Sequence, residues 1–519
     1  MAQRSVQIIG YLALSCLMLV TAWAFYGLGS LAEGRLSWTV FTDPYIHRIL
    51  GFSLKQAALS ATIAVLLALP VARALYYLPE LVGKSTFLAL CLLCFVLPTL
   101  VLITGLVALL GSSGWLTPYL GKSWSLYGMQ GILLAHLFLN SPFAIRAFYL
   151  QLQALPASSW LLARQLKLSS WQQWTLLEWP QLRARLLTVW VFIFVLCFNS
   201  FAVVLSLGGG PQATTLEVAI YQALKYDFNI PEALSLAWLQ LLIAGSLYLL
   251  MTRFGSSGWL SADTAKLQFL PIPPRWQARL HQLSYYLAWV VLLLPLLALI
   301  PNLLQINAER FSKLTIMKPL LTTLSLGVTA AGLAVLLALL ILSPIRKARL
   351  EYQTRKQWLL DGLANHHLVM PAMVLSVGLY VWCLKHLNLE TWGMAFVVLV
   401  NTLGLVPFAI QQLKPRLFQF DDQYQHLAQQ LKLNTLIYWH VLLPWLARDL
   451  QAAFLLCLLL AMGDVAIFSI FANDSWISLP WLIYSYAGSY RIVEASVLSF
   501  LFLLICAVLV FWLEKIKNQ

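Results

Sequence analysis

The sequence predicts an all-α membrane protein with about twelve transmembrane helices in two homologous six-helix halves. Three observations support this prediction. First, 61% of the 519 residues are hydrophobic, only 10% are charged, and the mean hydropathy is +0.80, which lies far outside the range of soluble globular domains. Second, apolar runs of about 20 residues, long enough to cross a bilayer, recur along the chain. Third, motifs of the first half return in the second half at a nearly constant offset.

Twelve apolar runs are long enough to span a membrane. They lie near 8–28, 53–77, 86–110, 129–152, 184–207 and 233–252, and then near 285–304, 317–343, 359–382, 391–412, 449–471 and 492–513. The first run follows a single basic residue and has no small-residue cleavage site. We therefore expect it to be a retained span rather than a signal peptide.

The repeat divides the chain into its predicted domains. Pro-Phe-Ala-Ile at 142–145 recurs at 407–410, 265 positions later, and Leu-Glu-Val-Ala-Ile-Tyr at 216–221 pairs with Leu-Pro-Trp-Leu-Ile-Tyr at 479–484, at an offset of 263. We expect a first transmembrane half at 1–252, a cytoplasmic linker at 253–284 and a second half at 285–519. The linker contains Gly-Ser-Ser-Gly and Pro-Ile-Pro-Pro, which are typical of turns and extended chain.

The basic residues indicate how the chain is oriented. With the N-terminus inside, 23 of the 33 Lys and Arg side chains fall on the inner side and 10 on the outer side, as the positive-inside rule requires. We therefore expect both termini in the cytoplasm. The net charge of +14 is explained by this bias, so no nucleic-acid partner is expected.

Cysteine and histidine do not point to a metal or redox site. All seven cysteines lie in apolar runs, and Cys91 and Cys94 form a C-x-x-C inside a Leu-rich span, so neither a disulfide framework nor a metal site is expected. His366 and His367 have no third ligand cluster nearby in the sequence. We expect no cofactor bound by this chain.

Two polar, helix-capable segments, at 163–180 and 428–444, interrupt the apolar runs. Both begin Ala-x-Gln-Leu-Lys-Leu and reach a Pro before the next apolar run. A Lys or Arg at the centre of a span costs roughly 2.5 to 3.5 kcal/mol, so Arg164 and Lys167 keep the first segment out of the membrane. The interpretation is a short helix, ended by Pro, that is offered on the inner side to a soluble partner.

These segments resemble the coupling-helix motif of the transmembrane subunits of ATP-driven ABC importers. The family pattern is Glu-Ala-Ala, three residues, Gly, nine residues, Ile-x-Leu-Pro. Ala163 falls on its second Ala, Lys167 on its Gly and Pro180 on its Pro, whereas the Glu position holds Leu161. The second copy matches likewise at Ala428, Lys432 and Pro444, in a segment one residue shorter. The Gly that would supply a turn inside the coupling helix is therefore Lys in both copies.

The resemblance implies a type I ABC importer permease-like fold, with coupling helices near 157–180 and 422–444. It implies that ATPase coupling is carried by Ala163, Lys167, Ser169, Pro180, Ala428, Lys432 and Pro444.

The two halves differ most after the fifth span of each. The first half reads Leu-Gly-Gly-Gly-Pro at 207–211 and Thr-Thr-Leu-Glu-Val-Ala-Ile-Tyr-Gln-Ala-Leu at 214–224. This composition predicts an outer re-entrant turn and a short helix capped by Thr214 or Thr215, with Glu217 in its first turn. No Gly-Lys-Ser/Thr follows the glycines, so a Walker-type nucleotide site is excluded.

The second half has Gly463-Asp464 and Gly-Ser-Tyr-Arg at 488–491 in the corresponding region. Asp464 stands in an apolar run, and an acid there is expected to face a cavity or a partner. A hydrogen-bonded acid at a helix interface is an equally good interpretation.

These two stretches are similar to those of the permeases of thiamine and thiamine-pyrophosphate importers, and the likeness covers most of the chain. The resemblance implies import from the periplasm, two copies of a separate ATPase that hydrolyse ATP, a periplasmic solute-binding protein, and a bacterial inner membrane as the location. The fused permeases for ferric iron share the same plan and are the alternative. The chain itself would be a transport subunit and not an enzyme.

Thiamine carries a permanent thiazolium cation, which suits aromatic faces and carboxylates. The candidates for the substrate path are Tyr221, Tyr226, Asp227, Asp464, Tyr484 and Tyr490. Against this, Tyr and Trp near span ends usually form the interfacial belt.

Two other function classes fit the sequence less well. An ion-gradient-driven secondary transporter needs no ATPase docking site, so the paired polar segments argue against it. A membrane-embedded enzyme finds no supporting cluster of His, acids or Cys at catalytic spacing.

Overall fold

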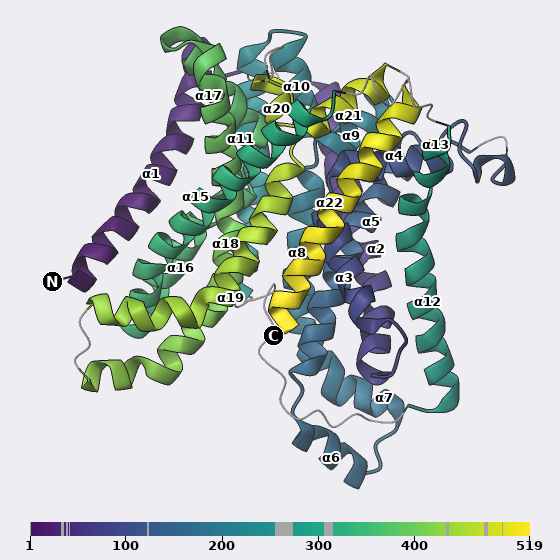
Figure 1. Ribbon diagram of the computed structural model, residues 1–519, viewed down its shortest axis with the longest axis vertical. Helices are drawn as coiled ribbons and strands as arrows, with labels where there is room; N and C mark the ends of the chain where they lie inside the picture. The colour runs from purple at the N-terminus through teal and green to yellow at the C-terminus, as the bar shows by residue number, and fades with distance from the viewer. Residues whose placement is uncertain are drawn as a thin grey trace.

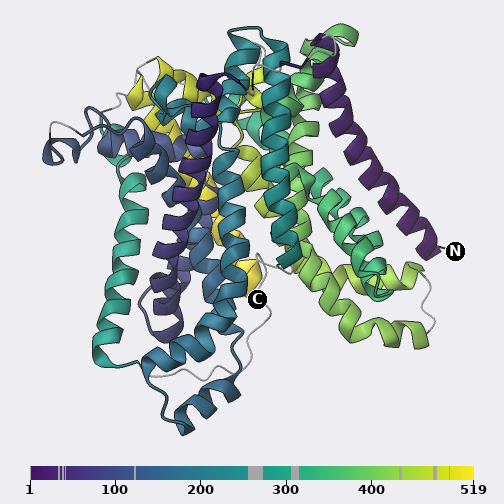
Figure 2. The ribbon, with the colours of Figure 1, turned by 180° about the vertical axis from the view of Figure 1, so that it is seen from behind.

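The computed structural model describes residues 2–32, 36–37, 40, 42–121, 124–254, 273–305, 315–431, 435–471, 476–489 and 491–518. In these residues the chain is a bundle of long, roughly aligned helices (Figures 1 and 2). We call the lower end in Figure 1, which holds α6 and α7, the basic end. The end that holds α10 and α21 is called the opposite end.

The first half runs from α1 to α11. Its helices are α1 (Ala2–Leu31), α2 (Pro44–Tyr77), α3 (Lys84–Val96), α4 (Thr99–Leu110), α5 (Met129–Gln153), α6 (Ala157–Gln165), α7 (Ser170–Gln173), a π-helical turn (Trp174–Glu178), α8 (Trp179–Phe198), α9 (Ala202–Leu207), α10 (Leu216–Lys225) and α11 (Ile230–Phe254). Short 3₁₀ turns lie at Thr117–Tyr119 and Pro211–Ala213.

The second half begins at α12. Its helices are α12 (Arg275–Leu297), α13 (Ile300–Leu303), α15 (Met317–Leu350), α16 (Thr354–Ala364), the 3₁₀ turn η5 (His366–Leu368), α17 (Ala372–His386), α18 (Leu389–Gln430), α19 (Thr435–Met462), α20 (Phe468–Phe471), α21 (Leu479–Gly488) and α22 (Ile492–Asn518). Of the predicted linker 253–284, residues 255–272 lie outside the described residues, and α12 already begins at Arg275.

Nine helices in the described part of the chain are long and apolar enough to cross a membrane, and two bent pairs raise this number to as many as eleven. The predicted number of twelve therefore stays a prediction, whereas the all-α, multi-span fold is confirmed. One bent pair corrects the span expected at 86–110. There α3 and α4 meet at 103°, because Pro98 has no N–H to continue α3 and holds Leu97 in an extended conformation.

Three other predicted spans are also interrupted. The spans expected at 184–207 and 449–471 end at Phe198 and Met462, and α9 and α20 follow as separate short helices. The span expected at 359–382 is divided into α16 and α17 by a turn before Pro371. Interrupted helices at membrane depth are tolerated where they are buried in protein or line a cavity, so these breaks mark the interior of the bundle.

The two halves repeat in space as well as in sequence. In the first half α2 packs against α5 and α8, and in the second half α15 packs against α18 and α19. A finer detail repeats too. The first N–H of α10, at Leu216, donates to Ser53 Oγ of α2 over 3.0 Å, and the first N–H of α21, at Leu479, donates to Thr323 Oγ1 of α15 over 2.8 Å.

The first helix of each half packs on the other half. Helix α1 lies against α15 and α17, while α12 lies against α2 and α4. Both crossings need glycine, because a Cβ added at Gly27 of α1 would lie 2.5 Å from the carbonyl oxygen of Gly378 in α17. Similarly, a Cβ at Gly105 of α4 would lie 2.3 Å from the carbonyl oxygen of Pro295 in α12. These close contacts connect the halves.

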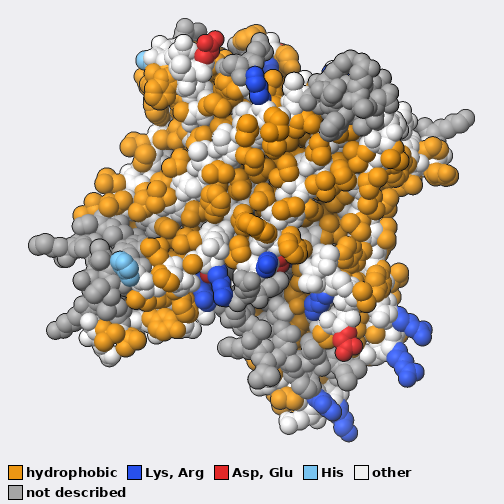
Figure 3. Space-filling model, in the orientation of Figure 1, with side chains coloured by type: hydrophobic (Ala, Val, Ile, Leu, Met, Phe, Trp, Pro, Cys, Tyr) orange, Lys and Arg blue, Asp and Glu red, His pale blue; other side chains and the backbone are white. Residues whose placement is uncertain are grey.

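The surface is divided as expected for a protein in a bilayer. Hydrophobic side chains cover the middle of the face shown in Figure 3, and most of the visible Lys and Arg side chains lie toward the basic end. Many large apolar side chains are exposed on the outside of the bundle, such as Leu12, Leu66, Leu287 and Val508. Burying them in lipid removes the cost of that exposure.

Candidate functional site

The first polar segment folds as two short helices joined by a tight turn. Helix α6 ends at Gln165, and Ser169 caps α7. The Ser169 Oγ accepts from the Gln172 N–H, and the Gln172 side chain accepts from the Ser169 N–H, which forms a capping box. The predicted coupling helix is therefore not continuous. It consists of two short helices joined by a turn, and the second leads through a π-helical turn into α8.

Lys167 makes the turn that glycine makes in the family pattern. Its φ is +50°, in the left-handed region. The Leu168 N–H donates to the Ala163 carbonyl over 3.0 Å, and the Lys167 N–H donates to the Arg164 carbonyl over 3.1 Å. These two bonds are those of a Schellman motif. The turn thus persists without glycine, at a cost of roughly 1 kcal/mol for a side chain in this conformation.

The buried and exposed faces of α6 differ from the predicted arrangement. Ala163 is only 2% exposed, and Trp160 on the same face lies near the rings of Tyr76 and Tyr77 of α2, with centroids 6.2 and 6.1 Å away. Ala163 therefore packs inside the chain. Several apolar side chains of this segment are exposed, Leu161 and Leu176 among them. Leu162, Leu166 and Trp171 lie close to the turn, and Trp171 is 72% exposed. We call these three the exposed apolar set.

The two prolines do not end helices as expected. Pro180 lies in the first turn of α8, where its missing N–H removes no helical bond. Pro444 lies inside α19, which continues to Met462. The second copy is thus the end of α18 and the start of α19 rather than a separate short helix. Ala428 lies near the end of α18, and Lys432 lies outside the described residues.

A buried carboxylate joins the first polar segment to α2. Glu178 is completely buried at the entry to α8. Arg73 of α2 binds it through Nε over 2.8 Å and through its terminal nitrogen over 3.2 Å, and the Tyr77 hydroxyl donates to it over 2.6 Å. The Arg73 guanidinium also lies over the Trp174 ring, 4.8 Å from its centroid. A bidentate ion pair of this kind fixes both the distance and the relative orientation of the two segments that it joins.

The second half has matching ion pairs at the basic end. Arg346 of α15 donates through Nε to Asp421 of α18 over 2.8 Å, and its terminal nitrogen forms a second bond to the same carboxylate. Nearby, Lys414 bonds both carboxylate oxygens of Asp361 over 2.7 Å. An arginine of α2 in the first half, and of α15 in the second half, therefore forms an ion pair with the chain next to the polar segment.

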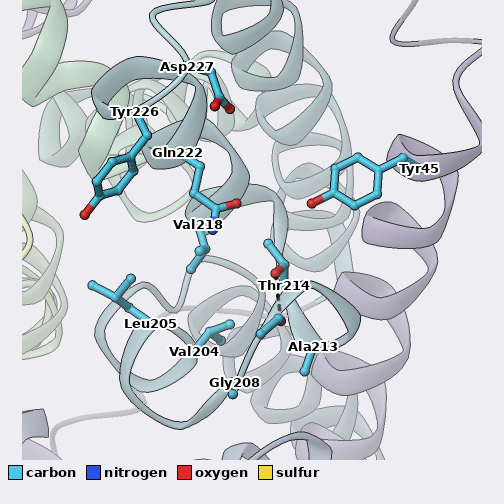
Figure 4. A pocket seen from close by; sticks show the side chains of 12 residues that line it. Tyr45, Val204, Leu205, Gly208, Ala213, Thr214, Val218, Gln222, Tyr226 and Asp227 are labelled. Carbon is cyan, nitrogen blue, oxygen red and sulfur yellow. Dashed lines mark hydrogen bonds between the residues drawn. The ribbon is translucent and has the colours of Figure 1, made fainter.

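The opposite end has a hollow of about 390 Å³ in the first half (Figure 4). Its lining comes from α2, α9, the glycine turn and α10, and includes Tyr45, Gln222, Tyr226 and Asp227. Figure 4 shows Tyr45 reaching from α2 toward the side chains of α10. Two of the predicted substrate-path residues, Tyr226 and Asp227, thus line one hollow.

Predicted tyrosines of both halves lie at this end. The rings of Tyr221 and Tyr226 meet edge to face, 5.9 Å apart, and Lys225 Nζ lies 5.2 Å from the Tyr221 centroid. Tyr484 of α21 lies at the same end of the bundle, with its ring centroid 5.4 Å from that of Trp481. Tyr221 and Tyr484 are equivalent in the repeat, so each half places a tyrosine of its short helix at the opposite end. Tyr490 lies outside the described residues.

Asp464 lies apart from the tyrosines, at the break that follows α19. Its Oδ1 accepts from the Ile467 N–H over 3.5 Å, and its Oδ2 is buried without a partner among the described residues. The neighbouring Gly463 faces Pro98, at the break between α3 and α4 of the other half. Asp464 therefore lies at the interface between the halves.

The equivalent break in the first half holds a polar network for which the sequence has no motif. Glu217, in the first turn of α10, is 1% exposed. Its Oε2 accepts from Gln240 Nε2 over 2.6 Å, and its Oε1 accepts from the Met373 N–H of the second half over 3.2 Å. Gln240 Nε2 also donates to Asn199, whose amide donates to the Leu368 carbonyl across the interface. The signal in the sequence was an acid in a helix flanked by apolar residues.

Comparison with known proteins extends these observations to the whole chain. No family model matches it. The chain is similar to the thiamine transport system permease protein ThiP of Haemophilus influenzae, with 36% identity over 95% of this chain and 94% of that protein. It is 34% identical to the protein of the same name from Escherichia coli, over 92% and 91% of the two chains. The Salmonella typhimurium protein of that name is 33% identical, over 98% and 96%.

Proposed function

The chain belongs to the family of thiamine transport system permease proteins, and on that basis we propose that it carries thiamine and thiamine pyrophosphate across the bacterial inner membrane into the cytoplasm. Energy would come from two copies of a separate ATPase, and solute from a periplasmic binding protein. The observation that carries the proposal is similarity along almost the full length of both chains, including both polar segments.

The basic end would face the cytoplasm. The predicted excess of Lys and Arg on that side supports this orientation, as does the position of both polar segments there (Figure 1). Both the start of α1 and the end of α22 lie in the lower half of that view. The ATPase would then reach the two segments without crossing the bilayer.

The exposed apolar set would form the contact with one ATPase subunit. Leu162 lies in α6, Leu166 is the residue that directly follows this helix, and Trp171 lies in α7. Exposed apolar side chains flanked by polar ones are typical of a protein contact. The predicted coupling residues Ala163, Lys167 and Ser169 would act through the packing, turn and cap that hold this set in place.

Helices α2 and α15 would transmit movement between the two ends. Arg73 and Ser53 lie on the same helix α2, 20 residues or about 30 Å apart at 1.5 Å per residue. Arg73 bonds Glu178 next to the coupling segment, and Ser53 holds the first N–H of α10 at the opposite end. In the second half, α15 connects Arg346 with Thr323 in the same way.

ATP binding would close the ATPase pair and draw the polar segments together. Because each segment is bonded to a rigid helix that reaches α10 or α21, this movement would separate those two short helices. The rings of Tyr221, Tyr226 and Tyr484 would then become accessible from the periplasm and accept the cation through their faces. Hydrolysis would reverse the movement and release solute to the cytoplasm.

Uptake of labelled thiamine into vesicles that contain the chain, its ATPase and its binding protein tests the substrate. We expect ATP-dependent accumulation of thiamine and none of ferric iron. Accumulation of iron and not thiamine would retain the importer architecture and refute the substrate assignment.

A further inference from the structure

We propose that Glu217 is the cation-recognition residue of the translocation path, where its carboxylate compensates the positive charge of the solute as it passes between the halves. The inference rests on the proposed function and assigns the recognition of the solute's charge to one side chain.

Glu217 lies at the contact between the two halves. It belongs to α10 of the first half, yet it accepts a hydrogen bond from the backbone of Met373 in the second half. Next to it, Asn199 ends α8 and bonds the Leu368 carbonyl in the turn between α16 and α17. Interrupted helices from both halves therefore meet around this carboxyl group, as at the substrate sites of transporters with discontinuous helices.

Glu217 also has no positively charged partner among the described residues. In the described part of the chain, the hydrogen-bond partners of Glu217 are an amide side chain and a backbone N–H, and it forms no ion pair. The buried acids Glu178 and Asp421 contrast with it, because an arginine neutralises each of them. Burial without a counter-charge opposes ionisation. Both of its partners are neutral donors, so nothing among the described contacts of Glu217 balances a negative charge there.

Buried polar atoms near Glu217 also have no hydrogen-bond partner among the described residues. Gln240 is completely buried, and its Oε1 has no partner among the described residues. The same holds for Thr215 Oγ1, two residues before Glu217. Buried polar atoms are almost always bonded in a finished structure. Their presence beside a carboxyl group points to a site that is completed when an additional group with donors or positive charge arrives.

A solute with a cationic ring and an attached amine would supply both the positive charge that Glu217 lacks and a hydrogen-bond donor for the unpaired acceptor. The positive charge would favour the ionised form of Glu217, and an amino group could donate to Gln240 Oε1. The equivalent break of the second half carries Asp464, whose Oδ2 is also buried without a partner in the described residues. The two breaks would thus present carboxyl groups from both sides of the interface.

Two substitutions separate recognition of charge from a structural role. Glu217→Gln keeps the volume and one accepted hydrogen bond but removes the charge. Glu217→Asp keeps the charge but is one methylene shorter, so it loses contact with Gln240 or Met373. If the charge matters, Asp should transport better than Gln, whereas a purely structural carboxyl group predicts the reverse order.

The experiment measures ATP-dependent thiamine uptake by the complete importer in vesicles, together with the unfolding temperature of each purified variant. We expect Glu217→Gln to lower the uptake rate by about tenfold or more with an unfolding temperature within about 3 °C of the wild type, and Glu217→Asp to recover part of the loss. Glu232→Gln is the matched control, because this acid at the start of α11 bonds Asn229 near the surface, and it should transport normally.

Uptake by Glu217→Gln within twofold of the wild type would overturn the inference. So would a lower rate for Asp than for Gln, or a loss of uptake that accompanies a large fall in unfolding temperature. Failure of the wild-type importer to take up thiamine would instead refute the proposed function.

Discussion

Loss of the Glu178 carboxylate should destabilise the protein more than any surface substitution. Glu178 is completely buried, whereas the Arg73 side chain keeps 20% of its surface exposed. Glu178→Gln would leave the guanidinium next to a neutral amide. Removing one partner of a buried ion pair costs about 3 to 5 kcal/mol. Because Arg73 retains some contact with solvent, we expect the lower end of this range, about 3 kcal/mol.

A double-mutant cycle isolates the ion pair from other effects of the substitution. In Arg73→Met with Glu178→Gln, the unpaired charge is gone, and the Tyr77 hydroxyl can still donate to the amide oxygen at 178. Replacing both members of a buried pair is often neutral. The double variant should therefore recover about 2 kcal/mol of the loss.

The assay is the free energy of unfolding of the purified protein in mixed micelles, measured for the wild type, both single variants and the double variant. A Glu178→Gln variant whose unfolding free energy lies within about 1 kcal/mol of the wild type would contradict this prediction, and so would a double variant less stable than either single one. Transport by the double variant should remain impaired, because the bond between α2 and the polar segment is absent.

Three further predictions concern the turn, a helix crossing and the partner surface. Lys167→Gly should keep transport and raise stability by about 1 kcal/mol because it relieves the left-handed side chain, and a less stable glycine variant in the same unfolding assay would contradict this. Gly378→Ala should cost about 1 to 3 kcal/mol through overpacking, since its Cβ would lie 2.0 Å from a backbone oxygen of α1, whereas Gly404→Ala, with open space around it, should not. Glu in place of both Leu162 and Leu166 should abolish co-purification of the ATPase without changing the unfolding temperature, and normal co-purification would exclude this surface as the contact.

The sequence predicted those features that depend on local composition. Apolar runs identified the helices, because lipid requires about 20 apolar residues whatever their neighbours are. The offset between halves predicted equivalent positions, and Leu216 and Leu479 indeed hold equivalent hydrogen bonds to hydroxyls of α2 and α15. The similarity to thiamine transport permeases that the short motifs indicate is confirmed over 95% of the chain.

The features that the sequence did not predict depend on tertiary contacts. The apolar run around Pro98 is long enough for one span, and only its packing shows two helices at 103°. The packing of α1 and α12 on the opposite halves cannot be predicted from the local sequence, because the glycines at these contacts resemble any other glycine in a transmembrane helix. Ala163 was expected at the partner surface, yet the outer face of α6 is formed by its leucines.

Glu217 illustrates the same limit for the candidate site. In the sequence it is an acid in the first turn of a short helix, where an acid is favoured by the helix dipole alone. Its second contact comes from Met373, which is 156 residues away. A residue whose partner belongs to the other half can be recognised only once the halves are placed together.

In the proposed mechanism, a separate ATPase drives this chain through its two polar segments. The most direct test compares thiamine uptake into vesicles with and without the ATPase, each with and without an ionophore that collapses ion gradients. We expect uptake only with the ATPase and ATP, and no effect of the ionophore. Uptake that continues without the ATPase and stops when the gradient collapses would contradict it.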